Sequence, residues 1–328
     1  MMLRIAVLDD YQSVSTRLAD WSRLEQQCSI TVFNRHLGSV EEAAAALQPF
    51  DVICLMRERM AFPRTLIERL PNLKMLSVTA IVNRTLDVAA ATERGIVVSH
   101  TGMGPQGQYG TAELAWGLIL SLARNIALEA HRMRSGGWQT TVGVTLEGKT
   151  LGILGLGRIG ARVCHYARAF DMQVIAWSQN MTADAAAAVG AIRVEKDELM
   201  RASDILSLHV VLSERTRGLL GERDLALMKP TAYLVNTARA ALVQEAALMD
   251  ALRNKRIAGA ALDVLHVEPL PDEHELRGMD NVVLTPHLGY TIEERLRLFH
   301  GKTVESIAAF VAGAPVRLVN PEVLGKRT

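Results

Sequence analysis

Short runs of apolar residues alternate with amphipathic segments along the whole chain. The first series of apolar runs is RIAVLDD, SITVFN, DVICLMR, KMLSVTA and GIVVSH, separated by helix-like segments such as VEEAAAALQ and PRTLIERL. Runs that are apolar throughout, instead of alternating between apolar and polar residues, predict strands that are covered on both faces. We therefore expect parallel strands joined by helices, which is an α/β fold.

A long helix-like stretch, roughly residues 111–134, interrupts this alternation and ends at Gly136-Gly137. The alternation then restarts with TLGILGLG, MQVIAW, AIRV, DILSLHV, AYLVN, GAALDV and NVVLTPH. Two series separated by a long helix predict two α/β domains with parallel sheets. We place the first domain at residues 1–101 with a returning tail at 290–328, and the second domain at 102–289.

Composition restricts the classes of function that the chain can have. The 328 residues contain 36 Lys+Arg and 35 Asp+Glu, so a net charge of +1 provides no field that attracts nucleic acid or an anionic membrane. No apolar stretch approaches the length of about 18 residues that a membrane span needs, and the apolar start MMLRIAVLDD is too short for a signal peptide. Cys28, Cys54 and Cys164 lie far apart without metal-ligand spacing. We expect a cytoplasmic protein with no metal site.

A glycine-rich turn follows the apolar run TLGIL and opens a helical pattern. Its sequence is Gly155-Leu156-Gly157-Arg158-Ile159-Gly160. In this context Gly155 permits a tight turn, Gly157 lets the backbone approach a pyrophosphate, and Gly160 allows the helix to pack closely on the strand. The N–H groups and the dipole at the start of the helix would then face the phosphates. The turn therefore predicts a dinucleotide-binding site.

The strand that follows this helix ends in VIAWSQN, residues Val174–Asn180. An NAD-binding fold carries an acid at this tip to hold the ribose hydroxyls, whereas this chain has Ser178, Gln179 and Asn180. The site could have lost its cofactor, could take a different one, or could be absent. Because a missing carboxylate no longer repels a 2′-phosphate, we favour an intact site for NADP or NAD, with NADP slightly preferred.

Polar residues stand at three further strand ends. Arg239 follows AYLVN, Glu268 lies five residues beyond Asp263, and His287 follows NVVLTP. Taken singly, they fit a helix cap, a solvated loop acid and a structural histidine. Taken together, an arginine can hold a carboxylate with two parallel hydrogen bonds, a histidine can exchange a proton near neutral pH, and a nearby acid favours the imidazolium. The three residues predict a catalytic site.

The motifs and their order resemble the D-isomer-specific 2-hydroxyacid dehydrogenase family, in particular its glyoxylate/hydroxypyruvate reductase-like members. The resemblance covers nearly the whole chain and rests on GKTLGILGLGRIG, MKPTAYLVNTARAALVQEAAL, AGAALDVLHVEPLP, NVVLTPHLGY, LDVAAATERGIVVSHT and TAELAWGLILSLAR. It implies two Rossmann-like or flavodoxin-like domains, with the nucleotide-binding domain inserted into the substrate domain, and a homodimer. It also implies an NAD(P)-dependent oxidoreductase that transfers a hydride between a nicotinamide cofactor and a small 2-oxo acid or D-2-hydroxy acid.

The resemblance also implies roles for single residues. Arg239 binds the substrate carboxylate, His287 exchanges the proton, and Glu268 orients His287. Backbone N–H groups near Ala80 and Ile81 contact the substrate, although the family usually carries glycine where this chain has Ala80. The residues expected to line the cofactor are Gly155, Gly157, Arg158, Ile159, Gly160, Ser178, Gln179, Asn180, His209, Val210, Thr237, Ala238 and Asp263.

Two alternatives remain open. A phosphite dehydrogenase on the same fold could use the same three residues, whereas formate enzymes of the superfamily pair the histidine with Gln and this chain has Glu268. A nucleotide-sensing scaffold, like the transcriptional corepressors that share the fold, would need none of the three. Turnover of glyoxylate or hydroxypyruvate with NADPH would separate an enzyme from a scaffold.

Overall fold

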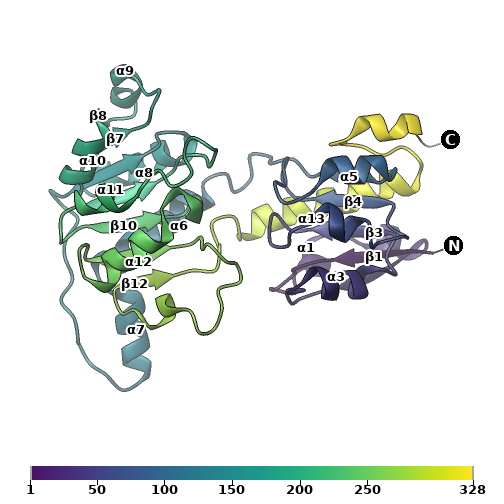
Figure 1. Cartoon of the computed structure of the whole chain (residues 1–328), viewed down its shortest axis with the longest axis horizontal. Coiled ribbons are helices and arrows are strands. Elements are labelled where there is room, and N and C mark those ends of the chain that lie inside the picture. Colours follow the sequence, from purple (N-terminus) through teal and green to yellow (C-terminus); the bar gives the residue numbers. More distant parts are fainter. Residues whose placement is uncertain (1, 327–328) are drawn as a thin grey trace. The chain divides into compact units, whose positions relative to one another are not determined.

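A computed structural model describes residues 2–326 and divides the chain into two compact units (Figure 1). The first unit runs to Gln108 and resumes at Ile292, and the second spans Tyr109–Thr291. The second unit is therefore inserted into the first. Both units are parallel sheets with helices, as the apolar runs predict.

The first unit is a five-stranded parallel sheet in the order β2-β1-β3-β4-β5. Its strands are β1 (Leu3–Val7), β2 (Cys28–Val32), β3 (Val52–Leu55), β4 (Met75–Val78) and β5 (Val97–His100). Its helices are α1 (Ser15–Leu18), α2 (Ser22–Glu25), α3 (Val40–Leu47), α4 (Arg64–Ile67), α5 (Val88–Glu93), α13 (Glu293–Val311) and the 3-10 helix η3 (Pro321–Lys326). Helices α3, α4 and α5 contribute to one buried core, and α2 and α13 to another. Every residue of β3 and β4 is buried, which explains why these runs are apolar throughout.

The second unit is a seven-stranded parallel sheet in the order β12-β11-β10-β9-β6-β7-β8. Its strands are β6 (Thr150–Leu154), β7 (Gln173–Trp177), β8 (Ile192–Arg193), β9 (Ile205–Leu208), β10 (Tyr233–Asn236), β11 (Gly259–Leu262) and β12 (Val282–Leu284). Its helices are α6 (Gly110–Ala123), α7 (Ile126–Arg134), α8 (Arg158–Ala169), α9 (Ala183–Ala187), α10 (Lys196–Ala202), α11 (Glu222–Ala226), α12 (Glu245–Arg253) and the 3-10 helices η1 (Ala240–Leu242) and η2 (Glu275–Gly278). Helices α6 and α8 contribute to one core of this unit, and α10, α11 and α12 to the other.

The long helix expected over residues 111–134 is two helices, so this prediction is wrong in detail. The break falls at Asn125, whose φ of 53° is left-handed and cannot continue a right-handed helix. Asparagine adopts this conformation more readily than most residues because its short polar side chain bonds locally. Its side-chain amide donates to the carbonyl of Val142 at 3.4 Å. Helix α6 is largely buried, whereas α7 has no buried residue.

The boundaries between the units fall after residues 108 and 291. The sequence suggested boundaries after residues 101 and 289. The segment up to Gln108 stays with the first unit because it packs on the start of α13. Gly107 lies directly against the side chain of Ile292, and Arg295 donates to the carbonyl of Gly104 at 3.4 Å. Among residues 2–326, no helix is both long and apolar enough to cross a membrane.

Candidate active site

The glycine turn, residues 155–160, joins β6 to α8 at the carboxyl edge of the seven-stranded sheet. Gly155 has a φ of 99°, and a Cβ there would lie 2.7 Å from Val210. A Cβ on Gly160 would collide with the carbonyl of Gly155, so α8 packs on the turn only because the side chain is absent. A Cβ on Gly157, in contrast, would meet no atom within 4 Å. Gly157 thus faces open space at the start of α8, which fits the approach of a pyrophosphate to the helix N-terminus.

The tip of β7 lies directly beside this turn. Leu154 is paired with Trp177, and the N–H of Gly155 donates to the carbonyl of Trp177 at 2.9 Å. Ser178 follows immediately and is half-buried, while Gln179 and Asn180 are exposed. The three neutral side chains therefore occupy the position at which this fold contacts the adenosine ribose.

His287 and Glu268 form the central contact of the site. The Nδ1 atom of His287 lies 2.8 Å from Oε2 of Glu268, while Oε1 of Glu268 accepts from the N–H of Leu265 at 2.9 Å. Burial by itself would raise the pKa of Glu268, but these hydrogen bonds and the charges of His287 and Arg239 hold it below its usual value. Glu268 is thus an anion near neutral pH. It holds a proton on Nδ1 and leaves Nε2 of His287 for proton exchange.

Arg239 follows β10, and its charge acts on Glu268. The turn that carries Arg239 is fixed by Asn236, which is almost fully buried. Asn236 Nδ2 donates to the carbonyl of Arg239 at 2.9 Å, and its Oδ1 accepts from the N–H of Ala238 at 3.0 Å. Asn236 is not among the residues expected from the sequence, although an asparagine at the end of an otherwise apolar strand is a signal for such a positioning role. Strands β10, β11 and β12 are neighbours, so the structure brings Arg239, Glu268 and His287 to one edge.

Asp263, directly after β11, holds the segment that carries His287 through hydrogen bonds. Its Oδ1 accepts from the hydroxyl of Thr285 and the N–H of Leu288, both at 2.6 Å, and its Oδ2 accepts from the N–H of Gly289 at 2.9 Å. Burial raises the pKa of Asp263, although these bonds and the charge of His287 oppose the change. His287 itself has a left-handed φ of 55°, a strained conformation for a residue with a side chain. The bonds of Asp263 on both sides of His287 hold this backbone in place.

The other expected cofactor-lining residues follow β9 and β10 at the same edge. Burial lowers the pKa of His209 to about 4, so its imidazole is neutral, and its Nε2 lies 2.9 Å from the hydroxyl of Ser207. Val210 packs against Gly155. The buried hydroxyl of Thr237, next to Ala238, has no hydrogen-bond partner within residues 2–326. A buried hydroxyl without a partner at a sheet edge fits a bound polar ligand.

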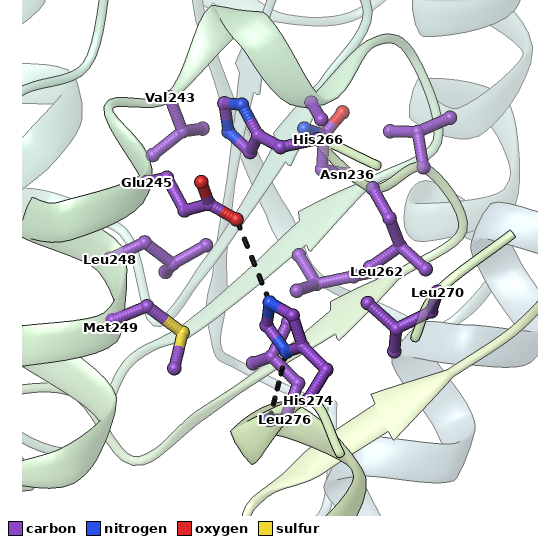
Figure 2. Close-up of a pocket in the computed structure, with 13 residues that line it drawn as sticks. Asn236, Val243, Glu245, Leu248, Met249, Leu262, His266, Leu270, His274 and Leu276 are labelled. Atoms are coloured by element: carbon purple, nitrogen blue, oxygen red, sulfur yellow. Dashed lines mark hydrogen bonds and ion pairs between the residues drawn. The ribbon is translucent and has the colours of Figure 1, made fainter. Parts of the chain in front are cut away.

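The segment from residue 264 to 274, which we name the acid loop, carries Glu268 and rests on a small cavity (Figure 2). The cavity has a volume of about 20 Å³, enough for one water. Figure 2 shows the side chains of Glu245 and Leu248 from α12 on one side of it and His274 facing Glu245, with Nε2 to Oε1 at 3.8 Å. Arg277 clamps the loop from outside by donating to the carbonyls of Leu270 and Pro271 at 2.6 and 2.9 Å. The cavity therefore lies beneath the acid loop, and none of Arg239, Glu268 and His287 lines it.

Ala80 and Ile81 follow β4 in the first unit. The N–H of Ala80 donates to the hydroxyl of Thr101 at 2.8 Å, so it is not available to a ligand as the resemblance implied. Ala80 nevertheless takes the left-handed conformation that glycine prefers, with a φ of 69°, and is buried. Ile81 has an exposed side chain. The backbone at Ala80 therefore keeps the left-handed conformation that glycine favours, although this chain has alanine where the family usually has glycine.

We expect Ala80→Gly to leave the free energy of unfolding within about 0.5 kcal/mol of wild type, because relief of the left-handed strain offsets the extra chain entropy of glycine. The matched control is Ala45→Gly, at an exposed position inside α3, which should cost about 1 kcal/mol because glycine is a poor helix former. Urea unfolding of the two variants measures the difference. Equal destabilisation by both would show that the backbone at Ala80 is not strained.

Comparison with known proteins identifies the family of this chain. The family described as "D-isomer specific 2-hydroxyacid dehydrogenase, NAD binding domain" matches residues 116–289, which lie within the second unit. A glyoxylate reductase of Aeropyrum pernix is 42% identical over 80% of this chain and 81% of its own length. The chain belongs to the D-2-hydroxyacid dehydrogenase family. It is therefore a nicotinamide-dependent oxidoreductase of 2-hydroxy and 2-oxo acids.

Two further comparisons show that the likeness extends over nearly the whole chain. A glyoxylate reductase of Thermofilum pendens is 36% identical over 93% of this chain and 92% of its own length. A solved structure described as a D-3-phosphoglycerate dehydrogenase oxidoreductase from Ralstonia solanacearum superposes with a TM-score of 0.91 at 36% identity, covering 98% of each chain. The dehydrogenase fold is thus shared from end to end.

Proposed function

We propose that this dehydrogenase reduces small 2-oxo acids of the glyoxylate and hydroxypyruvate type to D-2-hydroxy acids. The observation that carries the proposal is the contact of 2.8 Å between His287 Nδ1 and Glu268 Oε2, with the charge of Arg239 beside it. Glyoxylate reductases with 42% and 36% identity support the substrate class. The second unit is the dinucleotide-binding domain, and the first is the substrate domain.

The proposed mechanism assigns one task to each side chain. Arg239 binds the substrate carboxylate through two parallel hydrogen bonds and draws electron density from the neighbouring carbonyl. The hydride for the carbonyl carbon would come from a reduced nicotinamide dinucleotide held at the glycine turn and the strand ends of the second unit. His287 gives the proton on Nε2 to the carbonyl oxygen, while Glu268 accepts from Nδ1 and stabilises the charged ring. Asp263 holds the backbone around His287 and, by the family resemblance, lies beside the nicotinamide carboxamide.

The test is an assay of the purified chain with a panel of 2-oxo acids and both reduced cofactors. We expect oxidation of the cofactor with glyoxylate or hydroxypyruvate, and formation of the D isomer when the product is chiral. Phosphite, offered with the oxidised cofactors, tests the alternative reaction on the same fold. Turnover of phosphite without turnover of any 2-oxo acid would reject the proposal.

We further propose that the cofactor is NADPH in preference to NADH. The support is the neutral tip Ser178-Gln179-Asn180, which lacks the acid that would repel a 2′-phosphate. Arg158, at the start of α8, adds a positive charge next to the glycine turn. The residues that would hold the dinucleotide are Gly157, Arg158, Ile159, Ser178, Gln179, Asn180, His209, Val210, Thr237 and Ala238.

We expect Ser178→Asp to shift preference toward NADH by at least about tenfold, or about 1.4 kcal/mol, because the new carboxylate repels the 2′-phosphate and accepts from the ribose hydroxyls. The ratio of kcat/KM for NADPH to that for NADH measures the shift. The control is Ser39→Asp, which adds the same charge at the N-cap of α3, where Asp caps as well as Ser. A wild type that strongly prefers NADH, together with no effect of Ser178→Asp, would reject this placement of the ribose.

We also propose that the chain is a homodimer joined through its second unit. The support is a group of exposed apolar side chains on α7 and the segment after it: Ile126, Met133, Trp138 and Val142, of which Val142 is 94% exposed. Exposed apolar side chains that gather into one patch mark a protein–protein contact, and these four residues belong to one segment of the chain, 126–142. Light scattering that shows a monomer at working concentration would contradict the dimer without affecting the proposed reaction.

We propose a cytoplasmic location, supported by three cysteines that are all free and buried in the structure. Fractionation of the cells that produce the protein measures this directly. Recovery in a membrane or secreted fraction would reject it.

A further inference from the structure

A basic side chain from another strand holds the turn that follows β7. The N–H of Met181 donates to the carbonyl of Ser178 at 3.1 Å and closes the turn, which we name the tip turn (Ser178–Met181). Strand β8, at the end of the sheet, pairs Arg193 with Ala176 of β7. From there the Nε of Arg193 donates to the carbonyl of Met181 at 3.0 Å. A guanidinium group thus contacts the tip turn from the neighbouring strand.

The tip turn lies where the 2′ position of a dinucleotide is recognised. It begins one residue after Trp177, whose carbonyl accepts from Gly155 of the glycine turn at 2.9 Å. In this fold the pyrophosphate sits at the glycine turn and the adenosine ribose at the tip of the second strand. A residue that fixes the tip turn therefore acts on the part of the cofactor that differs between NADPH and NADH.

Arg193 is the basic residue that contacts the tip turn. The segment 172–195 also contains two acids, Asp184 in the first turn of α9 and Glu195 next to Arg193. Arg193 is 33% exposed, and its Nη1 pairs with Oε1 of Glu195 at 2.8 Å. Because Glu195 is 71% exposed, this ion pair is weak and can be exchanged. An arginine has five N–H donors, so Arg193 can hold the turn through Nε while its other donors face a phosphate.

We propose that Arg193 determines cofactor specificity by fixing the tip turn and by supplying the positive charge that favours a 2′-phosphate. The inference rests on the proposed use of a nicotinamide dinucleotide and extends it to a residue outside the glycine turn and the strand tip. In this proposal Arg193 positions Ser178, Gln179 and Asn180 through its bond to Met181 and carries the charge that a 2′-phosphate would meet. When no 2′-phosphate is bound, Glu195 neutralises the charge of Arg193 through their ion pair.

The test compares two adenosine fragments that differ by one group, adenosine 2′,5′-bisphosphate and adenosine 5′-monophosphate. Isothermal titration calorimetry measures the affinity of each for the wild type and for Arg193→Gln, Arg193→Lys and Glu195→Gln. The control is Arg201→Gln, which removes the same charge from an exposed position on α10. Neither fragment carries nicotinamide, so the result does not depend on whether the enzyme reduces a 2-oxo acid.

We expect Arg193→Gln to lower the preference for the bisphosphate by about tenfold, since it removes charge-assisted contacts. Arg193→Lys should restore part of the preference, Glu195→Gln should increase it, and Arg201→Gln should leave it unchanged. Equal loss of both fragments in Arg193→Gln would show a purely structural role and overturn the proposal. If Arg193→Gln does not fold, a Glu195→Gln variant with unchanged preference overturns it in the same way.

Discussion

We expect His287→Ala to lower kcat for 2-oxo acid reduction by about 10²–10⁴, the range that a positioned general acid contributes. The substitution removes the proton donor and leaves Arg239 and the glycine turn unchanged, so KM should change less than kcat. Steady-state kinetics under saturating cofactor measure both constants. The matched control is His165→Ala, an exposed histidine on α8, and wild-type turnover by His287→Ala would reject the assignment.

The pH dependence separates the role of Glu268 from that of His287. Reduction consumes the proton that His287 delivers, so its rate falls as pH rises. Glu268 is an anion near neutral pH because its pKa lies below the usual value, and its charge stabilises the protonated ring beside it. In Glu268→Gln that stabilisation is lost, so we expect the fall in kcat to move to lower pH. An unchanged pH profile would show that the contact with Glu268 only orients the ring.

The second large effect is expected for Arg239→Ala, with a loss of about 10²–10⁴ in kcat/KM, because two hydrogen bonds to a charged group contribute about 1.5–3 kcal/mol each. Unlike His287→Ala, this variant should raise KM and lower kcat together, since Arg239 both binds the carboxylate and polarises the carbonyl. Initial rates over a range of glyoxylate concentrations measure the split. Arg239→Lys should be intermediate, because lysine keeps the charge but not the two parallel donors. An Arg239→Ala enzyme that loses kcat alone would contradict a carboxylate-binding role.

Much of the fold could be predicted because its signals are local. An apolar run between helical patterns indicates a buried parallel strand wherever it occurs. The carboxyl ends of such strands share one edge, so Arg239, Glu268 and His287 could be grouped before their distances were known. The spacing of the three glycines likewise predicts a tight turn with room for a ligand at its second glycine. The structure has this turn, with Gly157 facing open space.

The side-chain contacts of Arg193 and Asp263 depend on which strands pair and in what register. Local sequence patterns do not reveal that pairing. The contact of Arg193 with the tip turn follows from the register of β8 on β7, and the bonds of Asp263 follow from that of β12 on β11. The break at Asn125 was hidden because the apolar pattern continues through it. Local patterns identify the elements, whereas side-chain partners appear only when the elements are paired.

The left-handed backbone at His287 sets a cost in stability against the placement of the proton donor. A histidine in this conformation costs the fold about 1 kcal/mol relative to a glycine. The fold is therefore less stable at this position than glycine would make it, and in exchange it carries an imidazole that glycine cannot provide. The bonds of Asp263 to Thr285, Leu288 and Gly289 offset part of that cost while they hold the ring toward Glu268.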